Sequence, residues 1–217
     1  MLGILSDPNE FFRRRVSKPG ILVPLLIVIL TAVVAGVGAI PGAELTAQFV
    51  SDSAQAQGGE INESTAETVG AVSAFFGIAA AFGIVLIAWI LYSVVFYLIA
   101  RFAFDGTGSL KHTVSFTGWG FVPLLVEKIV GAVAAYYVFS GASLPESSQA
   151  AQDSFQELQN DPVFLVSGIL GLALLLWSSA IWTAAMEQLH DLSRRDAMLT
   201  VGITVAIPFL SRVVGLL

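Results

Sequence analysis

Apolar residues run along this chain in five long blocks, separated by stretches that are rich in polar residues. Each block has roughly the 20 residues that an α-helix needs to cross the ~30 Å hydrocarbon core of a membrane. Few or no charged residues interrupt the blocks. The pattern therefore predicts five transmembrane helices, at about residues 20–40, 69–100, 115–140, 162–186 and 197–217.

The composition agrees with this pattern. Hydrophobic residues make up 56% of the 217 residues and charged residues only 12%, whereas soluble domains carry about 25% charged residues. The absence of cysteine excludes disulfides, thiolate catalysis and cysteine-based metal sites. We expect an all-α polytopic membrane bundle, in which residues 20–217 form a single five-helix transmembrane domain and residues 1–19 form a cytoplasmic basic segment.

The basic N-terminal segment contains the signals of a short helix. Asp7 can cap it, Pro8 suits its first turn, and Glu10 follows three residues after the cap. Phe11 and Phe12 then share one side, and the three arginines that follow spread around the rest. We interpret this segment as an interfacial helix whose arginines face lipid headgroups. An unstructured positive flank is the alternative.

The charges predict the orientation in the membrane. Eight of the ten Lys and Arg residues lie in the N-terminal segment and in the connectors 101–114 and 187–196. The stretches 41–69 and 141–161, which we read as solvated loops, carry nine acidic residues and no basic one. By the positive-inside rule, the N-terminus is expected in the cytoplasm and the C-terminus outside, in a multi-pass protein of the cell membrane.

The other two basic residues, Lys128 and Arg212, lie inside predicted spans, and Glu127 precedes Lys128. At 1.5 Å per residue, Glu127 lies about 20 Å into the third span and Arg212 about 22 Å into the fifth. Ionisable groups at such depth are costly. They could form a structural clamp, in which Glu127 neutralises Arg212 or Lys128, or line a polar path in a small transporter or channel subunit. We expect Glu127 to face the fifth span.

Enzymatic sites are harder to find. Glu187 and His190 have the Glu-x-x-His spacing of carboxylate-bridged metal sites, but such sites need the spacing twice, and it occurs once here. A solvated helix end is the simpler interpretation, and a metal-dependent enzyme is the weakest alternative. The serines within the spans have no histidine in a span to act as base. We therefore expect no enzyme, and no catalytic, cofactor-binding or metal-binding residues.

A family resemblance comes from residues 106–125, where Gly-x-Gly-Ser-Leu-Lys-His-Thr is followed by Gly-Trp-Gly-Phe-Val-Pro. With the Phe-Phe-Arg-Arg of the N-terminal segment and the five-span layout, these residues resemble the Yip domain family of Ypt/Rab-interacting-type membrane proteins, in its prokaryotic branch. Gly118, Trp119 and Pro123 are similar to the Gly-aromatic-x-x-x-Pro motif of that family's third span.

The resemblance implies the five-helix architecture and a non-enzymatic role as adaptor or organiser of the membrane. The partners expected from it are membrane lipids and other membrane proteins or a second copy, without cofactor or nucleic acid. The Asp-Leu-Tyr-Gly-Pro element of eukaryotic members is absent, so GTPase binding does not carry over. Independently of the family, Gly118 and Gly120 permit a close helix crossing, and Pro123 predicts a kink near Trp119.

Overall fold

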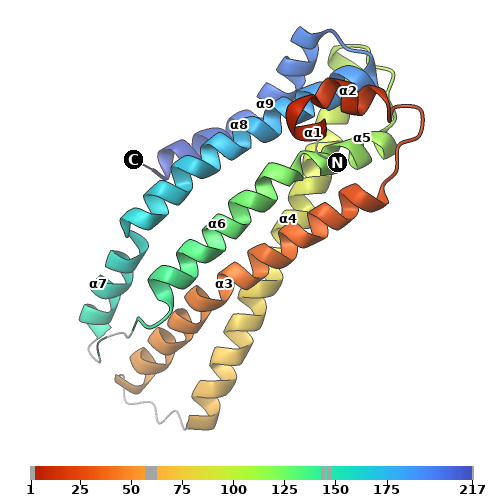
Figure 1. Ribbon diagram of the computed structural model, residues 1–217. Coiled ribbons are helices and arrows are strands. Elements are labelled where there is room, and N and C mark those ends of the chain that lie inside the picture. The colour runs from red at the N-terminus through yellow and green to blue at the C-terminus, as the bar shows by residue number, and fades with distance from the viewer. Residues whose placement is uncertain (1–2, 57–62, 143–144, 146–147, 217) are drawn as a thin grey trace. The chain divides into compact units, whose positions relative to one another are not determined.

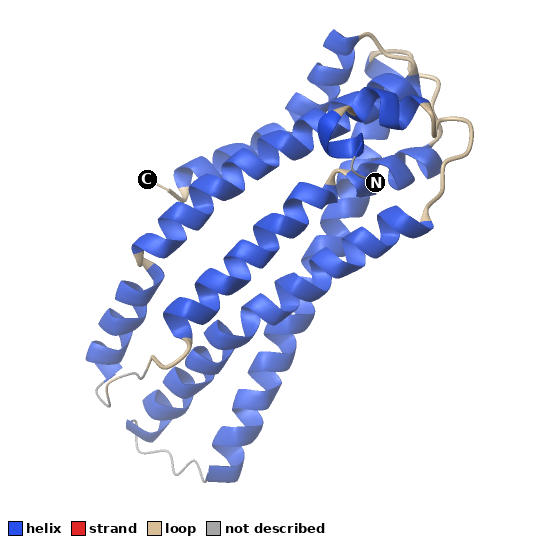
Figure 2. Cartoon of the chain, viewed as in Figure 1, coloured by secondary structure: helices blue, strands red, loops and turns tan. Residues whose placement is uncertain are grey.

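The computed structural model describes residues 3–56, 63–142, 145 and 148–216. Helices joined by short loops make up this part of the chain, and it contains no strand (Figure 2). The helices, labelled in Figure 1, are α1 (Gly3–Ser6), α2 (Pro8–Arg13), α3 (Leu22–Ala56), α4 (Glu63–Ala103), α5 (Leu110–Trp119), α6 (Phe121–Phe139), α7 (Ser148–Gln159), α8 (Pro162–His190) and α9 (Arg194–Val214).

Five helical segments of the described chain are long and apolar enough to cross a membrane. They are Leu22–Gln48, Gly70–Ala103, Phe121–Phe139, Gln149–His190 and Arg194–Val214. The predicted fold class, an all-α membrane protein with five transmembrane helices, is confirmed. Asp7 also caps α2 as predicted, since its carboxylate accepts the Glu10 N–H at 3.0 Å.

The predicted solvated loops are partly wrong, because helix continues into both. α3 runs on to Ala56 and α4 begins at Glu63, while α7 occupies most of the second acidic stretch. These segments are rich in Ala, Gln and Glu, which favour helix as strongly as many apolar residues do. Hydropathy marks where a segment leaves the hydrocarbon core, and the helix itself can end much later.

The third span also differs from the prediction of one segment at about 115–140. It is divided into α5 and α6 at Gly120, whose N–H donates to the Thr117 carbonyl at 3.1 Å. Pro123 follows in the first turn of α6, where a residue without an N–H loses no helical hydrogen bond. The interruption therefore lies next to Trp119, where the kink was expected.

The chain forms two compact units, and several helices pass from one into the other. The first unit consists of Met1–Thr31, Val85–Glu127 and Ile169–Leu217, and the second of Ala32–Ile84 and Lys128–Gly168. In the second unit, a Cβ on Gly38 would lie 2.9 Å from the Ala132 Cβ, so α3 and α6 meet closely there. The single domain expected for residues 20–217 stays a prediction.

Candidate functional site

The residues of the family resemblance converge on α5, which lies in the first unit. Most of this ten-residue helix is buried: Thr113, Ser115, Phe116, Thr117, Gly118 and Trp119. Its N-terminus is capped by Ser109, whose hydroxyl accepts the His112 N–H at 3.4 Å. A helix that is this polar and this buried needs partners for its side chains and its terminal carbonyls.

Two tryptophans supply partners for the α5 backbone. The indole of Trp89, on α4, donates to the Val114 carbonyl at 2.9 Å. The indole of Trp182, on α8, donates to the Thr117 carbonyl at 2.7 Å. Trp182 is fully buried and occupies the space beside Gly120, where an added Cβ would lie 2.0 Å from the indole nitrogen. Only glycine fits at position 120, because this indole fills the volume of a side chain.

The other side of α5 meets the start of α3. A Cβ on Gly118 would lie 2.7 Å from the Pro24 Cβ, which is closer than real Cβ contacts. Nearby, the Ser115 hydroxyl donates to the Gly20 carbonyl at 2.9 Å. The close helix approach expected at these glycines is found at Gly118, whereas the space beside Gly120 holds the Trp182 indole.

The N-terminal segment packs on α5 as well. The rings of Phe11 and Trp119 lie 4.8 Å apart in an edge-to-face arrangement, and those of Phe12 and Phe116 lie 5.1 Å apart. The Arg15 guanidinium lies 3.7 Å from the centroid of the Phe11 ring, a cation–π geometry. The apolar side of α2 thus faces protein, and its buried phenylalanines attach the basic segment to the first unit.

His190 is a buried structural residue and not the solvated helix end that the sequence suggested. It is 0% exposed, and its Nε2 lies 2.9 Å from the Thr113 hydroxyl oxygen. The loop before α5 packs against it: a Cβ on Gly108 would lie 2.8 Å from the imidazole, and one on Gly106 would lie 3.0 Å from the His190 Cβ. The Gly-x-Gly element is explained by this enclosure.

Glu187 and His190 were the candidate metal ligands of the sequence. Over the described part of the chain, no three His, Cys, Asp or Glu side chains are grouped closely enough to hold a metal ion. Glu187 instead lines a pocket with residues of α1, α2 and α9. Glu187 therefore faces this pocket, whereas His190 is enclosed by α5 and the loop before it.

Glu127 and Arg212, which the sequence placed at similar depth, meet in the first unit. Arg212 Nη1 lies 2.9 Å from Glu127 Oε2 and also donates to the Gly171 carbonyl at 3.1 Å. The Arg212 side chain is 31% exposed and the Glu127 side chain 13%. The ion pair joins α6 to α9, and the carbonyl adds α8, so three helices meet at one guanidinium. Lys128, half-buried, is assigned to the second unit.

Trp89, Trp182 and His190 hold α5 in place, and none of these three contacts was predicted from the sequence. The tryptophans carried a usable signal, since a tryptophan deep in a predicted span has an N–H that must find an acceptor. His190 carried none, because polar residues are common where a helix leaves the membrane. His190 and Leu189, which lie close to Gly106 and Gly108, come from a distant part of the chain and could not be inferred from spacing.

Comparisons with known proteins agree with this arrangement. The model of the Yip1 domain family matches residues 2–215. A protein of Methanocaldococcus jannaschii that is described as uncharacterized is 28% identical over 139 residues, which is 64% of this chain and 89% of that protein. No solved structure matches. Because the family model covers the five spans, the α5 motif and the N-terminal segment alike, the chain belongs to the Yip1 domain family.

Proposed function

We propose that this protein is a membrane adaptor or organiser, which binds other membrane proteins or a second copy of itself and performs no chemistry. One observation carries the proposal: the motif residues of α5 are occupied in packing. Gly118, Gly120 and Trp119 each meet a neighbour within the first unit. Residues so engaged support a rigid scaffold, which leaves recognition to the exposed side chains around it.

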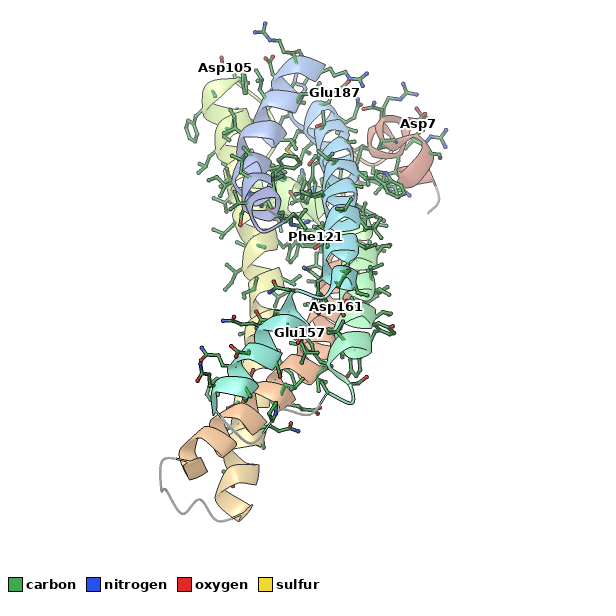
Figure 3. The ribbon with its side chains drawn as sticks, turned by 90° about the vertical axis from the view of Figure 1, so that its left-hand side faces the viewer. Asp7, Asp105, Phe121, Glu157, Asp161 and Glu187 are labelled. Carbon is green, nitrogen blue, oxygen red and sulfur yellow. The ribbon has the colours of Figure 1, made fainter. Side chains whose placement is uncertain are left out.

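The exposed basic residues supply such a surface. Arg13 and Arg14, which both pair with Glu10, belong to the segment attached to α5, and Lys111 lies on α5 itself. Arg194 and Arg195 begin α9. Figure 3 shows Asp7 of the N-terminal segment, Asp105 in the loop before α5 and Glu187 near the end of α8 at the same end of the first unit. We propose that this end faces the cytoplasm, with the end of the fifth span on the outside.

The Glu127–Arg212 pair supports a clamp in preference to a transport path. A path for ions or protons needs a polar group that can exchange its partner, whereas this carboxylate is neutralised by a guanidinium that also binds a backbone carbonyl. The pair joins α6 and α9 in the way that intramembrane ion pairs hold helices together. We therefore keep the adaptor role as the proposed function.

Affinity purification from native membranes in mild detergent, followed by quantitative mass spectrometry, tests the proposal. A partner at fixed stoichiometry is expected, and its recovery should fall when Arg195→Glu and Lys111→Glu are combined. Glu157→Lys, on the exposed face of α7, is the matched charge reversal and should leave recovery unchanged. A lone monomer that conducts ions in liposomes would overturn the adaptor role.

A further inference from the structure

We propose that a groove between α8 and α9 holds one phospholipid from the membrane leaflet on the Arg194 side. The inference goes beyond the adaptor role and holds whether or not the chain binds a protein partner. It rests on two adjoining cavities of the first unit. One is apolar, the other, called the polar cavity below, has charged side chains in its lining, and the two share residues and so form a single groove.

The apolar cavity has a volume of about 400 Å³, within the range of ~300–1,000 Å³ that is usual for small-molecule sites. Two small residues on α9, Gly202 and Ala206, lie exposed in it. Leu176 on α8 and Phe209 on α9 line it further from the polar end. The hydroxyls of Ser179 and Thr183 donate to carbonyls of their own helix at 2.8 Å, so the wall presents no free donor to a hydrocarbon chain.

The polar cavity has a volume of about 390 Å³ and shares Ala180, Thr183 and Met198 with the apolar one. Charged groups of both signs line it: Asp7 and Glu187 on one hand and Arg194 on the other. Within the described part of the chain, neither Glu187 nor Arg194 takes part in a salt bridge. Figure 3 shows Asp7 and Glu187 near one another at the end of the first unit.

The length of the groove selects a lipid as the occupant. Along α9 the apolar cavity runs from Met198 to Phe209, which is about 16 Å at 1.5 Å per residue. That length matches one leaflet, or half of the ~30 Å hydrocarbon core. A transmembrane helix of a second copy would need a groove that crosses the whole core. A single leaflet's hydrocarbon chain fits the groove that is present.

The charges select the headgroup. Arg194 suits a lipid phosphate, because a guanidinium donates two parallel hydrogen bonds to such an anion. The Glu187 carboxylate suits an ammonium group. So does the Asp7 carboxylate, which also caps α2. A zwitterionic phospholipid with a primary amine satisfies both signs, whereas a phospholipid without an amine, such as phosphatidylglycerol, would leave the two carboxylates without a cation. We therefore assign the site to an amine-bearing zwitterionic phospholipid.

The test is titration of the purified full-length protein in detergent with phosphatidylethanolamine, with phosphatidylglycerol in a parallel series, followed by native mass spectrometry. One phosphatidylethanolamine should bind per chain. Gly202→Leu fills the groove without a clash, since a Cβ there meets nothing within 4 Å, and should weaken binding by about tenfold or more. Gly131→Leu on α6, where a Cβ also meets nothing within 4 Å, is the matched control and should bind normally.

A second pair of variants tests the headgroup. Arg194→Gln should weaken binding, and Arg195→Gln, the neighbouring exposed arginine that does not line the groove, should not. Equal binding by all four variants, tighter binding of phosphatidylglycerol, or a dimer that Gly202→Leu dissociates without any lipid being bound would each overturn the assignment. The readout counts bound lipid alone, so its failure leaves the adaptor proposal standing.

Discussion

The indole nitrogen of Trp182 lies 2.7 Å from the Thr117 carbonyl oxygen, which links α8 to the last turn of α5. Carbonyls in the last turn of a helix have no N–H partner four residues later, and the Thr117 carbonyl instead accepts the Gly120 N–H at 3.1 Å and this indole N–H. The third span is interrupted at Gly120, and the indole supplies a donor at that point. The interruption and the tryptophan are therefore parts of one arrangement.

Gly120→Ala should destabilise the protein strongly. The new Cβ would lie 2.0 Å from the Trp182 indole nitrogen, and overpacking of this kind costs about 1–3 kcal/mol or more. Thermal unfolding in detergent measures the effect. Gly131→Ala is the control, because its Cβ has open space and alanine favours helix over glycine by about 1 kcal/mol. Equal midpoints for the two variants would contradict the packing described.

Trp182→Phe keeps an aromatic ring but removes the indole N–H. The Thr117 carbonyl would lose this donor but keep the Gly120 N–H, so the lost hydrogen bond costs about 0.5–1.5 kcal/mol, and the smaller ring adds a packing loss. Trp177→Phe serves as the comparison, because Trp177 is 41% exposed. The free energy of unfolding in denaturant should fall for Trp182→Phe only, and an equal fall for both would count against the hydrogen bond.

Glu127→Gln and Arg212→Gln should be non-additive. Each single change leaves one charge without its opposite inside a membrane segment, whereas the double variant leaves none. Because Arg212 is about a third exposed, we expect a coupling energy of about 1–2 kcal/mol, within the usual range for paired residues. A thermal-stability cycle in detergent measures it. Full additivity, or a stable Glu127→Gln protein, would argue against a clamp.

The proposed orientation can be tested with single cysteines, since the chain has none of its own. Ser17→Cys in the basic segment and Gln152→Cys on α7 both replace exposed residues. A membrane-impermeant maleimide added to intact cells should label Gln152→Cys, and should label Ser17→Cys only after the membrane is opened. The reverse pattern would invert the topology.

The sequence predicted most of the fold because hydrocarbon imposes a length and an apolarity on every span. It also predicted that Glu127 would face the fifth span, because the two charges could be placed by depth alone. It did not predict the ends of α3 and α4, since polar helix formers continue a helix after hydropathy has fallen.

The candidate site was less accessible from the sequence, for a physical reason. Gly118 and Gly120 indicate that another part of the chain comes close, but a glycine does not identify that neighbour. Pro24 and Trp182, which fill these spaces, come from spans one and four and meet α5 only in the folded chain. His190 was misread for the same reason, because its burial depends on the loop that closes over it.

The attachment of α5 has an optical consequence. Of the four tryptophans, Trp119 belongs to α5, and Trp89 and Trp182 donate to its carbonyls. The near-ultraviolet fluorescence of the unlabelled protein is therefore dominated by chromophores that touch a single ten-residue helix. Any ligand, partner or lipid that shifts α5 should therefore change the tryptophan emission of the protein, without an attached dye.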